Sequence, residues 1–418
     1  MKKIILSIKL ILRSKFIFKT PSKCDLVVFD EVALNDLNIC LSNFNFFVLQ
    51  TRLQNINKIY FSYKILKKIF KNYFKGNLFT VYLVSLIEVI RPKVVITSMD
   101  NSFKFFDIAK ILEEKISFIA IQSAARYDVL EFNYLYSANK LKDNWLEKFY
   151  IPNLFCFGDY EKQLYKQLNI KVKNIYPIGN LRLANSLHKT KIESNSSKKY
   201  SFDICLIADA CPPYSNKAIK NNIIYSSLFE SGDLERGYVE IVKYTIKFCI
   251  KNSMNLVIPL KRDKKKYSYG NKMEIDFYKR NFSKEEFDYL KQSFLEKYRD
   301  NFSSFKAVLS SKVVVGTSST LLRDKLGTGG KILSCNLTKA DIYNFPINGI
   351  CTLNNCSYEE FEKRLLEIFF MSQESFLSKI DKKPGYVMKF NKNFSTINLI
   401  REKLTQLGVD QIQHYTKN

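Results

Sequence analysis

The feature that most constrains the fold is a series of short, continuously apolar segments that alternate with helical patterns. In the first part of the chain these segments lie at 26–29, 46–49, 94–97, 118–121 and 154–157. Continuous apolar strands separated by helices are typical of a parallel sheet that is buried on both faces. The sequence therefore predicts a Rossmann-like half between residues 24 and 178.

A second set of apolar segments follows, at 204–207, 256–259, 313–315, 332–334 and 350–353. Helices between them are marked by two capping boxes, in which a Ser precedes a Glu by three residues: Ser283 with Glu286, and Ser357 with Glu360. A second α/β half is therefore predicted. The segment 185–200 is polar and has no periodicity, so we expect it to be the linker between the halves.

The length of the chain fits this division, because 418 residues are too many for one compact core and suit two domains. Neither half carries the Gly-rich fingerprint of a dinucleotide-binding fold. The pattern favours the GT-B arrangement of glycosyltransferases, two Rossmann-like domains facing each other across a cleft, over a dehydrogenase. We expect an acceptor domain at 1–184, the linker at 185–200, a nucleotide-sugar donor domain at 201–370, and a helical segment at 371–418 that packs back.

The chain is strongly basic, with 66 Lys and Arg against 40 Asp and Glu and a formal charge of +26. Such an excess favours polyanionic partners, of which nucleic acid, anionic lipid and nucleotide-sugar phosphates are candidates. The sequence has no arginine-rich run, zinc-finger spacing or RNP-like motif. Nucleic acid is therefore disfavoured as a partner, and an anionic membrane surface is expected instead.

Cysteine and histidine usage argues against a metal or redox mechanism. The nine cysteines are scattered without a CxxC pair, which suggests small buried hydrophobes in a reducing compartment. With only His188 and His414 in the chain, a His-based metal site is not expected. We therefore expect a metal-independent reaction without a cofactor, unless carboxylates hold Mg²⁺, and the nucleotide-sugar donor is then a substrate.

The N-terminal run 2–19 is apolar and basic but does not read as a signal peptide. Lys9 and Arg13 interrupt the apolar residues, and no small-residue cleavage site follows. No segment approaches the roughly 20 apolar residues that cross a bilayer. The expected location is cytoplasmic and peripheral on the inner membrane.

A basic, amphipathic stretch at 63–75 is the candidate for the membrane contact. Five apolar residues are spaced to form one stripe, with five lysines around it. The residues of the stripe are Ile65, Leu66, Ile69, Phe70 and Tyr73. A stripe of this kind suits an anionic bilayer interface. It equally suits a helix that packs on its own sheet, so both interpretations stay open.

The strongest local signal for chemistry is a hydroxyl-rich turn that follows the apolar segment 313–315. The turn holds Ser318, Ser319 and Thr320 and opens a helix. Backbone N–H groups, hydroxyls and a helix dipole at such a turn suit one phosphate group. One of the hydroxyls could simply be the helix N-cap. Because three hydroxyls exceed what capping needs, the turn is our candidate phosphate site.

This segment resembles bacterial surface-carbohydrate biosynthesis proteins, which are GT-B-like and related to transferases that use CMP-activated Kdo or sialic-acid-like sugars. The resemblance rests on the hydroxyls at 318–320, on Asp324 in the following helix, and on the strand at 329–333. It implies that Ser318, Ser319 and Thr320 bind the donor phosphate. It also implies that Asp324 belongs to the donor site.

Many such transferases carry His-Pro after a strand of the donor domain, where this chain has Pro-Leu-Lys-Arg at 259–262. Lys261 and Arg262 are expected to contact a donor phosphate or carboxylate, since both side chains are cationic. The alternative is a solvated strand end. Glu274, beyond this loop, is a candidate for contacting sugar hydroxyls, or else an exposed charge on a helix.

Two loops of the first domain are expected to face the cleft, because ligands in open α/β sheets bind at the carboxyl ends of strands. One loop holds Asp100 and Asn101, and the other holds Gln122, Ser123 and Arg126. Both also resemble the surface-carbohydrate proteins. Asp100 could act as general base on an acceptor hydroxyl, or could form an Asx-turn or helix cap. The other four residues are candidates for acceptor binding.

Asp209 is a second candidate for the catalytic carboxylate. It follows the first strand of the donor domain, in a loop that should also face the cleft. In an enzyme that retains the anomeric configuration, such a carboxylate could be the nucleophile of a glycosyl-enzyme intermediate. The alternative is that the following Pro212 and Pro213 only mark a stiff turn.

The leading hypothesis is transfer of a sugar, of the Kdo or sialic-acid type, from a CMP-linked donor. The acceptor would be a bacterial surface polysaccharide, such as capsule or O-antigen, or its lipid-linked precursor. Two alternatives stay open. A CDP-polyol phosphotransferase of teichoic-acid type would transfer phosphate-linked glycerol, and a non-catalytic polysaccharide-assembly scaffold would bind nucleotide without turnover.

Overall fold

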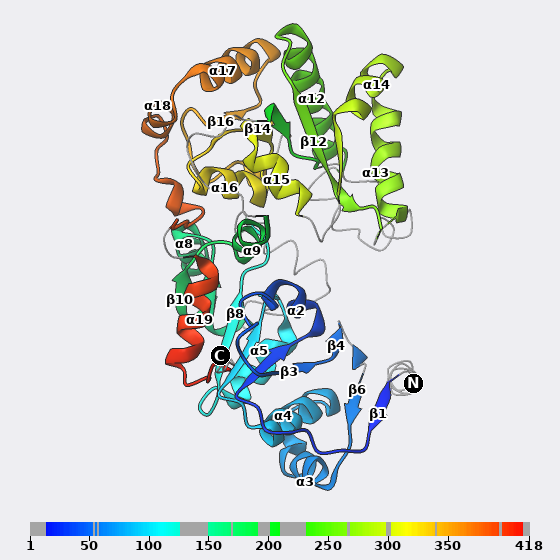
Figure 1. Cartoon of the computed structure of the whole chain (residues 1–418), viewed down its shortest axis with the longest axis vertical. Helices are drawn as coiled ribbons and strands as arrows, with labels where there is room; N and C mark the ends of the chain where they lie inside the picture. The colour runs from blue at the N-terminus through cyan, green and yellow to red at the C-terminus, as the bar shows by residue number, and fades with distance from the viewer. Residues whose placement is uncertain are drawn as a thin grey trace, which may run out of the picture.

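The computed structural model of the chain describes residues 14–52, 55–56, 58–125, 149–168, 170–190, 201–209, 231–265, 268–297, 302–338, 341–392 and 395–412. Two parallel six-stranded sheets form the centres of two domains, which lie one above the other in Figure 1. The C-terminal helix, drawn in red, returns to the N-terminal domain. The architecture is α/β with two Rossmann-like domains, as the alternating apolar segments predict.

The N-terminal sheet has the strand order β10-β9-β8-β7-β2-β3, and every neighbouring pair is parallel. Its strands are β2 (Leu26–Phe29), β3 (Phe46–Leu49), β7 (Val94–Thr97), β8 (Ser117–Ile121), β9 (Tyr150–Cys156) and β10 (Lys171–Pro177). The five predicted strands are confirmed. The apolar pattern does not predict β10, because this edge strand is only half-buried and carries two lysines and an asparagine.

Helices cover both faces of this sheet, as its continuously apolar strands require. One face packs against α3 (Tyr63–Asn72), α4 (Leu78–Ile90), α5 (Phe103–Leu112) and α8 (Asp159–Gln167). The other face packs against α2 (Glu31–Leu37), α9 (Leu181–Thr190) and α19 (Thr396–Gln406). Successive strand residues alternate between the faces, so that Val27 joins the first core and Leu26 the second.

The stretch 63–75 forms α3 and the 3-10 helix η1 (Tyr73–Lys75). Its apolar residues do not form the single stripe expected from the sequence. Ile65 is 1% exposed and Ile69 packs against the core, whereas Phe70 and Tyr73 are 78% and 63% exposed. The helix therefore packs on its own domain through one face and leaves aromatic side chains uncovered on the other.

Short strands extend the N-terminal domain beside α3. β1 (Lys15–Ile17) pairs in parallel with β6 (Lys58–Tyr60). β4 (Thr51–Arg52) pairs antiparallel with β5 (Asn55–Ile56), directly after β3. Figure 1 shows these strands on the side of the domain where the N-terminus lies.

The C-terminal sheet has the strand order β13-β12-β11-β14-β15-β16, again with parallel neighbours. Its strands are β11 (Phe202–Leu206), β12 (Leu256–Asp263), β13 (Phe294–Lys297), β14 (Ser311–Gly316), β15 (Lys331–Asn336) and β16 (Thr352–Asn354). The five predicted strands are confirmed, although β12 runs on to Asp263. The sequence pattern does not predict β13, because this strand begins directly after the last residue of the preceding helix, at Phe294.

The helices of the C-terminal domain surround this sheet (Figure 1). No helix in the described part of the chain is long and apolar enough to cross a bilayer. They are α12 (Ser231–Lys251), α13 (Ser268–Asn281), α14 (Lys284–Ser293), α15 (Ser303–Leu309), α16 (Thr320–Gly327), α17 (Tyr358–Phe370) and α18 (Gln373–Ser378). Both predicted capping boxes are confirmed. Ser283 opens α14 and Ser357 opens α17, each in reciprocal hydrogen bonds with the Glu three residues later.

The chain crosses between the two domains at two places, after α9 and after a short 3-10 helix near residue 386. Helix α9 extends to Thr190, so residues 185–190, the first part of the expected linker, are helical. The rest of that segment, 191–200, lies outside the described residues. The second crossing follows the 3-10 helix η4 (Pro384–Tyr386), where Lys389 donates from its backbone N–H to the Phe157 carbonyl at 2.8 Å. Helix α19 then packs on the N-terminal domain.

Gly158 lies where this second crossing meets α8. A Cβ atom at this position would stand 2.3 Å from the backbone oxygen of Tyr386. Only glycine therefore lets the returning segment approach α8 this closely. Tyr160, two residues on, packs edge-to-face against the Tyr386 ring at 5.8 Å between centroids.

A buried ion pair joins the two domains. Arg323 of α16 donates to Glu161 of α8 at 2.8 Å, and the two side chains are 1% and 0% exposed. Glu161 also accepts from the Gln122 amide and from the Gly158 backbone N–H. The Arg323 guanidinium lies 5.0 Å from the centre of the Tyr160 ring. Because buried charges are tolerated only when paired and hydrogen-bonded, this contact fixes α16 against the N-terminal domain.

We expect Arg323→Met to lower the free energy of unfolding by about 3–5 kcal/mol, because Glu161 would stay buried without its cation. Adding Glu161→Gln to this variant should recover part of the loss, since it removes the remaining buried charge. Urea denaturation of the wild type and both variants measures the differences.

The matched control is Lys379→Met, which breaks an exposed ion pair with Glu367 at the same 2.8 Å distance. Exposed pairs contribute at most about 1 kcal/mol, so the free energy of unfolding of this variant should remain close to that of the wild type. Equal losses for Arg323→Met and Lys379→Met would show that the buried pair does not hold the domains together.

Candidate functional site

A cavity of about 400 Å³ lies between the two domains. The N-terminal domain contributes Asp36, Ser123, Asn180 and Arg182 to its wall, among others. Across the cavity, the C-terminal domain contributes the end of β12, the end of β13 and the first turn of α16. This volume falls in the range of small-molecule sites in proteins, about 300–1,000 Å³.

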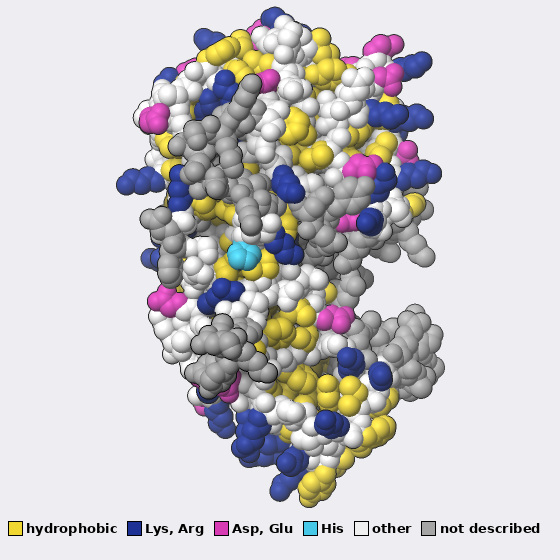
Figure 2. All heavy atoms as spheres, viewed as in Figure 1, with side chains coloured by type: hydrophobic (Ala, Val, Ile, Leu, Met, Phe, Trp, Pro, Cys, Tyr) yellow, Lys and Arg dark blue, Asp and Glu magenta, His cyan; other side chains and the backbone are white. Residues whose placement is uncertain are grey.

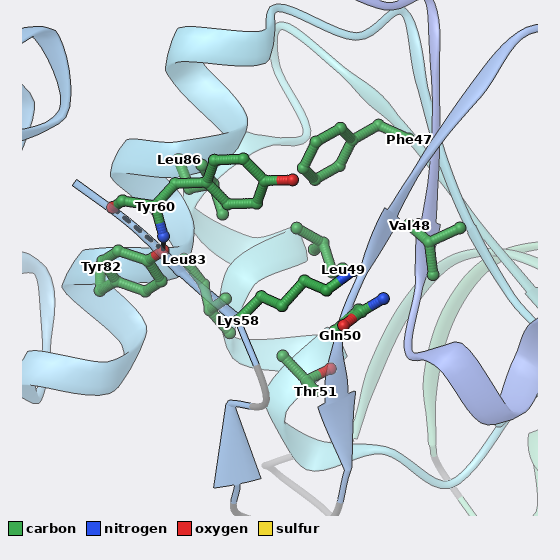
Figure 3. A pocket seen from close by; sticks show the side chains of 10 residues that line it. All are labelled: Phe47, Val48, Leu49, Gln50, Thr51, Lys58, Tyr60, Tyr82, Leu83 and Leu86. Atoms are coloured by element: carbon green, nitrogen blue, oxygen red, sulfur yellow. Dashed lines mark hydrogen bonds between the residues drawn. The ribbon is translucent and has the colours of Figure 1, made fainter. Parts of the chain in front are cut away.

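A second hollow, shown in Figure 3, lies within the N-terminal domain between β3, β6 and α4. Its volume is about 30 Å³, which is the room of a single water molecule. Thr51 lines it with a hydroxyl that is buried and has no hydrogen-bond partner among the described residues. One water would satisfy this hydroxyl, but a sugar or nucleotide would not fit. The interdomain cavity is the candidate active site, because charged and polar side chains of both domains line it.

Helix α16 presents its N-terminal turn to the cavity, but the three hydroxyls before it have different environments. Ser319 is the N-cap, and its side chain accepts a hydrogen bond from the Leu321 backbone N–H at 3.3 Å. Thr320 lines the cavity and accepts from the Ala125 backbone N–H of the other domain at 2.9 Å. Ser318 is 8% exposed and is not part of the cavity wall. The capping interpretation therefore holds for Ser319, and Thr320 is the hydroxyl that faces the site.

Cationic side chains come from the ends of two neighbouring strands. Lys261 and Arg262 at the end of β12 line the cavity and are exposed. Lys297 at the end of β13 joins them, since the two strands pair in this region. The sequence did not single out Lys297, because β13 itself was not predicted. Three cations and a helix N-terminus thus meet in one cavity.

Glu274 does not have either role expected from the sequence. It is fully buried on α13, and its two carboxylate oxygens accept hydrogen bonds from the backbone N–H groups of Lys261 and Arg262, at 2.8 and 2.9 Å. Burial raises the pKa of this carboxyl, and the two N–H groups act in the opposite direction. Glu274 is neither a sugar ligand nor an exposed helix charge, but holds the Lys261–Arg262 backbone in place.

Asp324 lies one helical turn after Thr320 and also lines the cavity. Its carboxylate is 1% exposed and accepts two hydrogen bonds from the Asn180 amide of the other domain, at 3.0 and 3.1 Å. Burial raises the pKa of Asp324 to about 7, although the Asn180 contact and nearby Arg323 and Arg182 favour the ionised form. The side chain therefore changes charge near neutral pH.

Arg182 and Asp36 form a pair in the cavity wall that the sequence analysis missed. The guanidinium of Arg182 on α9 donates twice to the Asp36 carboxylate on α2, at 3.0 and 2.8 Å. The Arg182 side chain keeps 42% of its surface exposed. No local motif marks either residue, since they are far apart in the sequence and only the fold brings them together.

The four predicted acceptor residues of the N-terminal domain have four different placements. Ser123 lines the cavity, while Asn101 is exposed and is not part of its wall. Gln122 is 2% exposed, donates to Glu161 and accepts from the Phe157 backbone N–H, so it supports the domain interface. Arg126 lies outside the described residues. Of these four, only Ser123 is placed to meet a ligand in the described structure.

The two candidate catalytic carboxylates, Asp100 and Asp209, differ in burial and in their contacts. Asp100 is fully buried, is absent from the cavity wall and accepts hydrogen bonds from the Ser123 backbone N–H and hydroxyl, at 3.2 and 3.1 Å. This placement corrects its expected role as a base, because it positions the Ser123 loop instead. Asp209 is 22% exposed and lies 3.8 Å from the Lys261 ammonium. Burial raises the pKa of Asp209, and Lys261 lowers it.

No family profile matches the sequence, and no curated protein has a similar sequence. Among solved structures, UDP-GlcNAc 2-epimerase from Neisseria meningitidis bound to UDP-GlcNAc is similar, with a TM-score of 0.50, 14% identity, and coverage of 91% of this chain and 99% of that one. The likeness shows that this chain has the GT-B fold.

Two further structures align with lower scores. UDP-GlcNAc 2-epimerase from Methanocaldococcus jannaschii has a TM-score of 0.49 and 12% identity, with coverage of 91% of this chain and 99% of that one. A wall teichoic acid polymerase has a TM-score of 0.47 and 10% identity, with coverage of 97% and 95%.

The raised pKa of Asp324 leads to a prediction for anion binding. Below about pH 7 the protonated carboxyl tolerates an anion one helical turn away, whereas above it the carboxylate repels the anion. We expect the affinity for CMP, relative to that of Asp324→Asn, to fall about threefold or more from pH 6 to pH 8. Isothermal titration calorimetry of both proteins measures the ratio.

The Asp324→Asn variant is the reference because its amide cannot ionise, while the phosphate of CMP titrates equally with both proteins. An affinity ratio that stays constant from pH 6 to pH 8 would contradict a titrating Asp324 beside the bound anion.

Proposed function

We propose that this chain is a glycosyltransferase that takes a sugar from a CMP-linked donor. The sugar would be of the Kdo or sialic-acid type, and the acceptor a bacterial surface polysaccharide or its lipid-linked precursor. One observation carries the proposal: the first turn of α16 opens into an interdomain cavity that is also lined by Lys261, Arg262 and Lys297. The GT-B fold and the resemblance of the 318–333 segment support the same class of reaction.

The charge arrangement suits a leaving phosphate. A helix N-terminus carries a partial positive charge and unpaired backbone N–H groups. Three cationic side chains add full charges on the same side of the cavity. Thr320 is oriented by the Ala125 N–H, so its hydroxyl proton is left to donate to a ligand. Donors that are already in place can stabilise the negative charge that develops when the nucleotide leaves.

Among the described residues, the cavity wall contains carboxylates but no histidine, so we assign proton transfer to a carboxylate. We propose Asp209 as the general base or nucleophile; it is not itself part of the described cavity wall, but it lies 3.8 Å from the ammonium of Lys261, which is. Its side chain is partly exposed beside Lys261, and its pKa is raised by burial, which makes the carboxylate a stronger base than a solvated one. Asp100 would act indirectly, by holding the Ser123 loop against the acceptor.

The proposal predicts a nucleotide preference. CMP and CDP should raise the melting temperature more than UDP, GDP or NAD at equal concentration, because a ligand that binds only the folded protein stabilises it. Thermal unfolding with each nucleotide measures this. Equal shifts for all five would remove the support for a cytidine leaving group, and a larger shift with UDP would assign the donor to the uridine class.

Variants of the α16 turn should separate phosphate binding from helix capping. Thr320→Val should weaken CMP binding about tenfold, because a hydrogen bond to a charged group is worth roughly 1.5–3 kcal/mol. Ser319→Ala should cost about 1 kcal/mol of stability and leave CMP affinity nearly unchanged, because it removes only a cap. Calorimetric titration and urea denaturation measure the two quantities.

Lys261→Ala tests the charge contact in the same titration. Its loss of CMP affinity should shrink as salt is raised, because screening weakens the charge contact. Lys264→Ala is the matched control, since Lys264 lies three residues further on and pairs with Glu296 outside the cavity. If Thr320→Val and Lys261→Ala bind CMP like the wild type, the phosphate site lies elsewhere.

A further inference from the structure

Eight of the twelve large hydrophobic side chains that stand exposed in the described part of the chain belong to one short region, residues 16–78. We call these eight the aromatic patch: Phe16, Phe18, Phe61, Tyr63, Phe70, Tyr73, Phe74 and Leu78. Phe74 is 94% exposed, and Phe18 is 79% exposed. A soluble surface seldom keeps so many large apolar groups together unless they bind something.

The patch is assembled from β1, the end of β6, α3, η1 and the start of α4. Phe18 contacts Phe16 and Phe61, with ring centroids 6.4 and 5.9 Å apart. Tyr73 contacts Phe74 edge-to-face at 5.4 Å. Figure 1 shows α3 at the end of the N-terminal domain that faces away from the C-terminal domain, and Figure 2 shows hydrophobic and basic side chains together at that end.

Packing of α3 does not require the exposed aromatics. The inner face of the helix is already complete, because Ile65 is buried and the Asn72 amide donates to Ser85 and Glu88 of α4, at 3.2 and 3.1 Å. Lys68 adds an ion pair with Glu88 at 3.0 Å. The outer face is therefore available for a partner rather than needed for the fold.

The charges around the patch indicate that the partner is anionic. Between Asp36 and Glu88 the sequence contains no acidic residue, whereas it contains seven basic ones. These seven are Arg52, Lys58, Lys64, Lys67, Lys68, Lys71 and Lys75. Lys64, Lys67, Lys71 and Lys75 are exposed on the same short helical segment as the aromatics. A second copy of this surface would be repelled, whereas an anionic surface would be attracted.

We propose that the aromatic patch docks this protein on the surface of an anionic lipid bilayer. The aromatic rings enter the boundary between headgroups and acyl chains, and the surrounding lysines pair with anionic headgroups. Attachment is peripheral, through one end of the N-terminal domain. The inference does not depend on the nucleotide or the reaction proposed above.

Vesicle sedimentation with the full chain tests the proposal. We expect the protein to bind vesicles of phosphatidylcholine mixed with phosphatidylglycerol, to bind pure phosphatidylcholine weakly, and to be released by salt. Phe70→Ser with Phe74→Ser should weaken binding to the mixed vesicles at least about tenfold, because two large apolar groups no longer enter the interface. Lys67→Glu with Lys71→Glu should weaken it by a similar factor.

Each variant has a matched control in the C-terminal domain. Tyr269→Ser with Phe370→Ser changes two aromatics that are 76% and 73% exposed, and Lys279→Glu with Lys291→Glu makes the same change in net charge. Both controls should bind vesicles like the wild type, and all variants should keep the wild-type melting temperature. Equal losses in patch and control variants would overturn the proposal. So would equal binding to both vesicle types, or a dimer in sedimentation velocity that Phe70→Ser with Phe74→Ser abolishes.

Discussion

The buried ion pair between Arg323 and Glu161 is the contact on which the candidate site depends. Its two charges lie at the centre of the domain interface, where neither can be left without the other. Arg323 sits on the same helix as Thr320 and Asp324, which also bond to the N-terminal domain. One short helix therefore bonds to the N-terminal domain at three positions and also supplies part of the wall of the cavity between the domains.

Two acidic side chains that the sequence suggested for the site, one as a base and one as a sugar ligand, hold its loops instead of lining the cavity. Glu274 binds the backbone of the Lys261–Arg262 loop, and Asp100 binds the Ser123 loop. Buried carboxylates of this kind fix loop geometry, because they accept hydrogen bonds from backbone N–H groups that would otherwise be unpaired. The Lys261–Arg262 loop and the Ser123 loop are thus each held by an acidic group behind them, and three of the cations of the cavity wall come from the strand ends.

Sequence reasoning succeeded where the signal is local and failed where it is not. The apolar strands in the middle of both sheets and the caps at Ser283 and Ser357 follow from patterns a few residues long. The edge strand β10 lacks such a pattern, because one of its sides has no neighbour to pack against. The pair Arg182–Asp36 depends on two helices meeting in space. Helical spacing also grouped Phe70 with Ile65, since spacing alone does not show which face of a helix meets the core.

Helix α19 has a consequence for how the protein is made. Its residues Ile397, Ile400 and Leu404 complete the hydrophobic core on one face of the N-terminal sheet, although they are encoded at the far end of the chain. During synthesis the strands of this sheet emerge well before residues 396–406, so the part of the face that α19 covers stays exposed until those residues follow, although α2 and α9 can already pack on the same face. The N-terminal domain is thus completed only after the strands of the C-terminal domain have been translated, and loss of α19 would expose part of its apolar sheet.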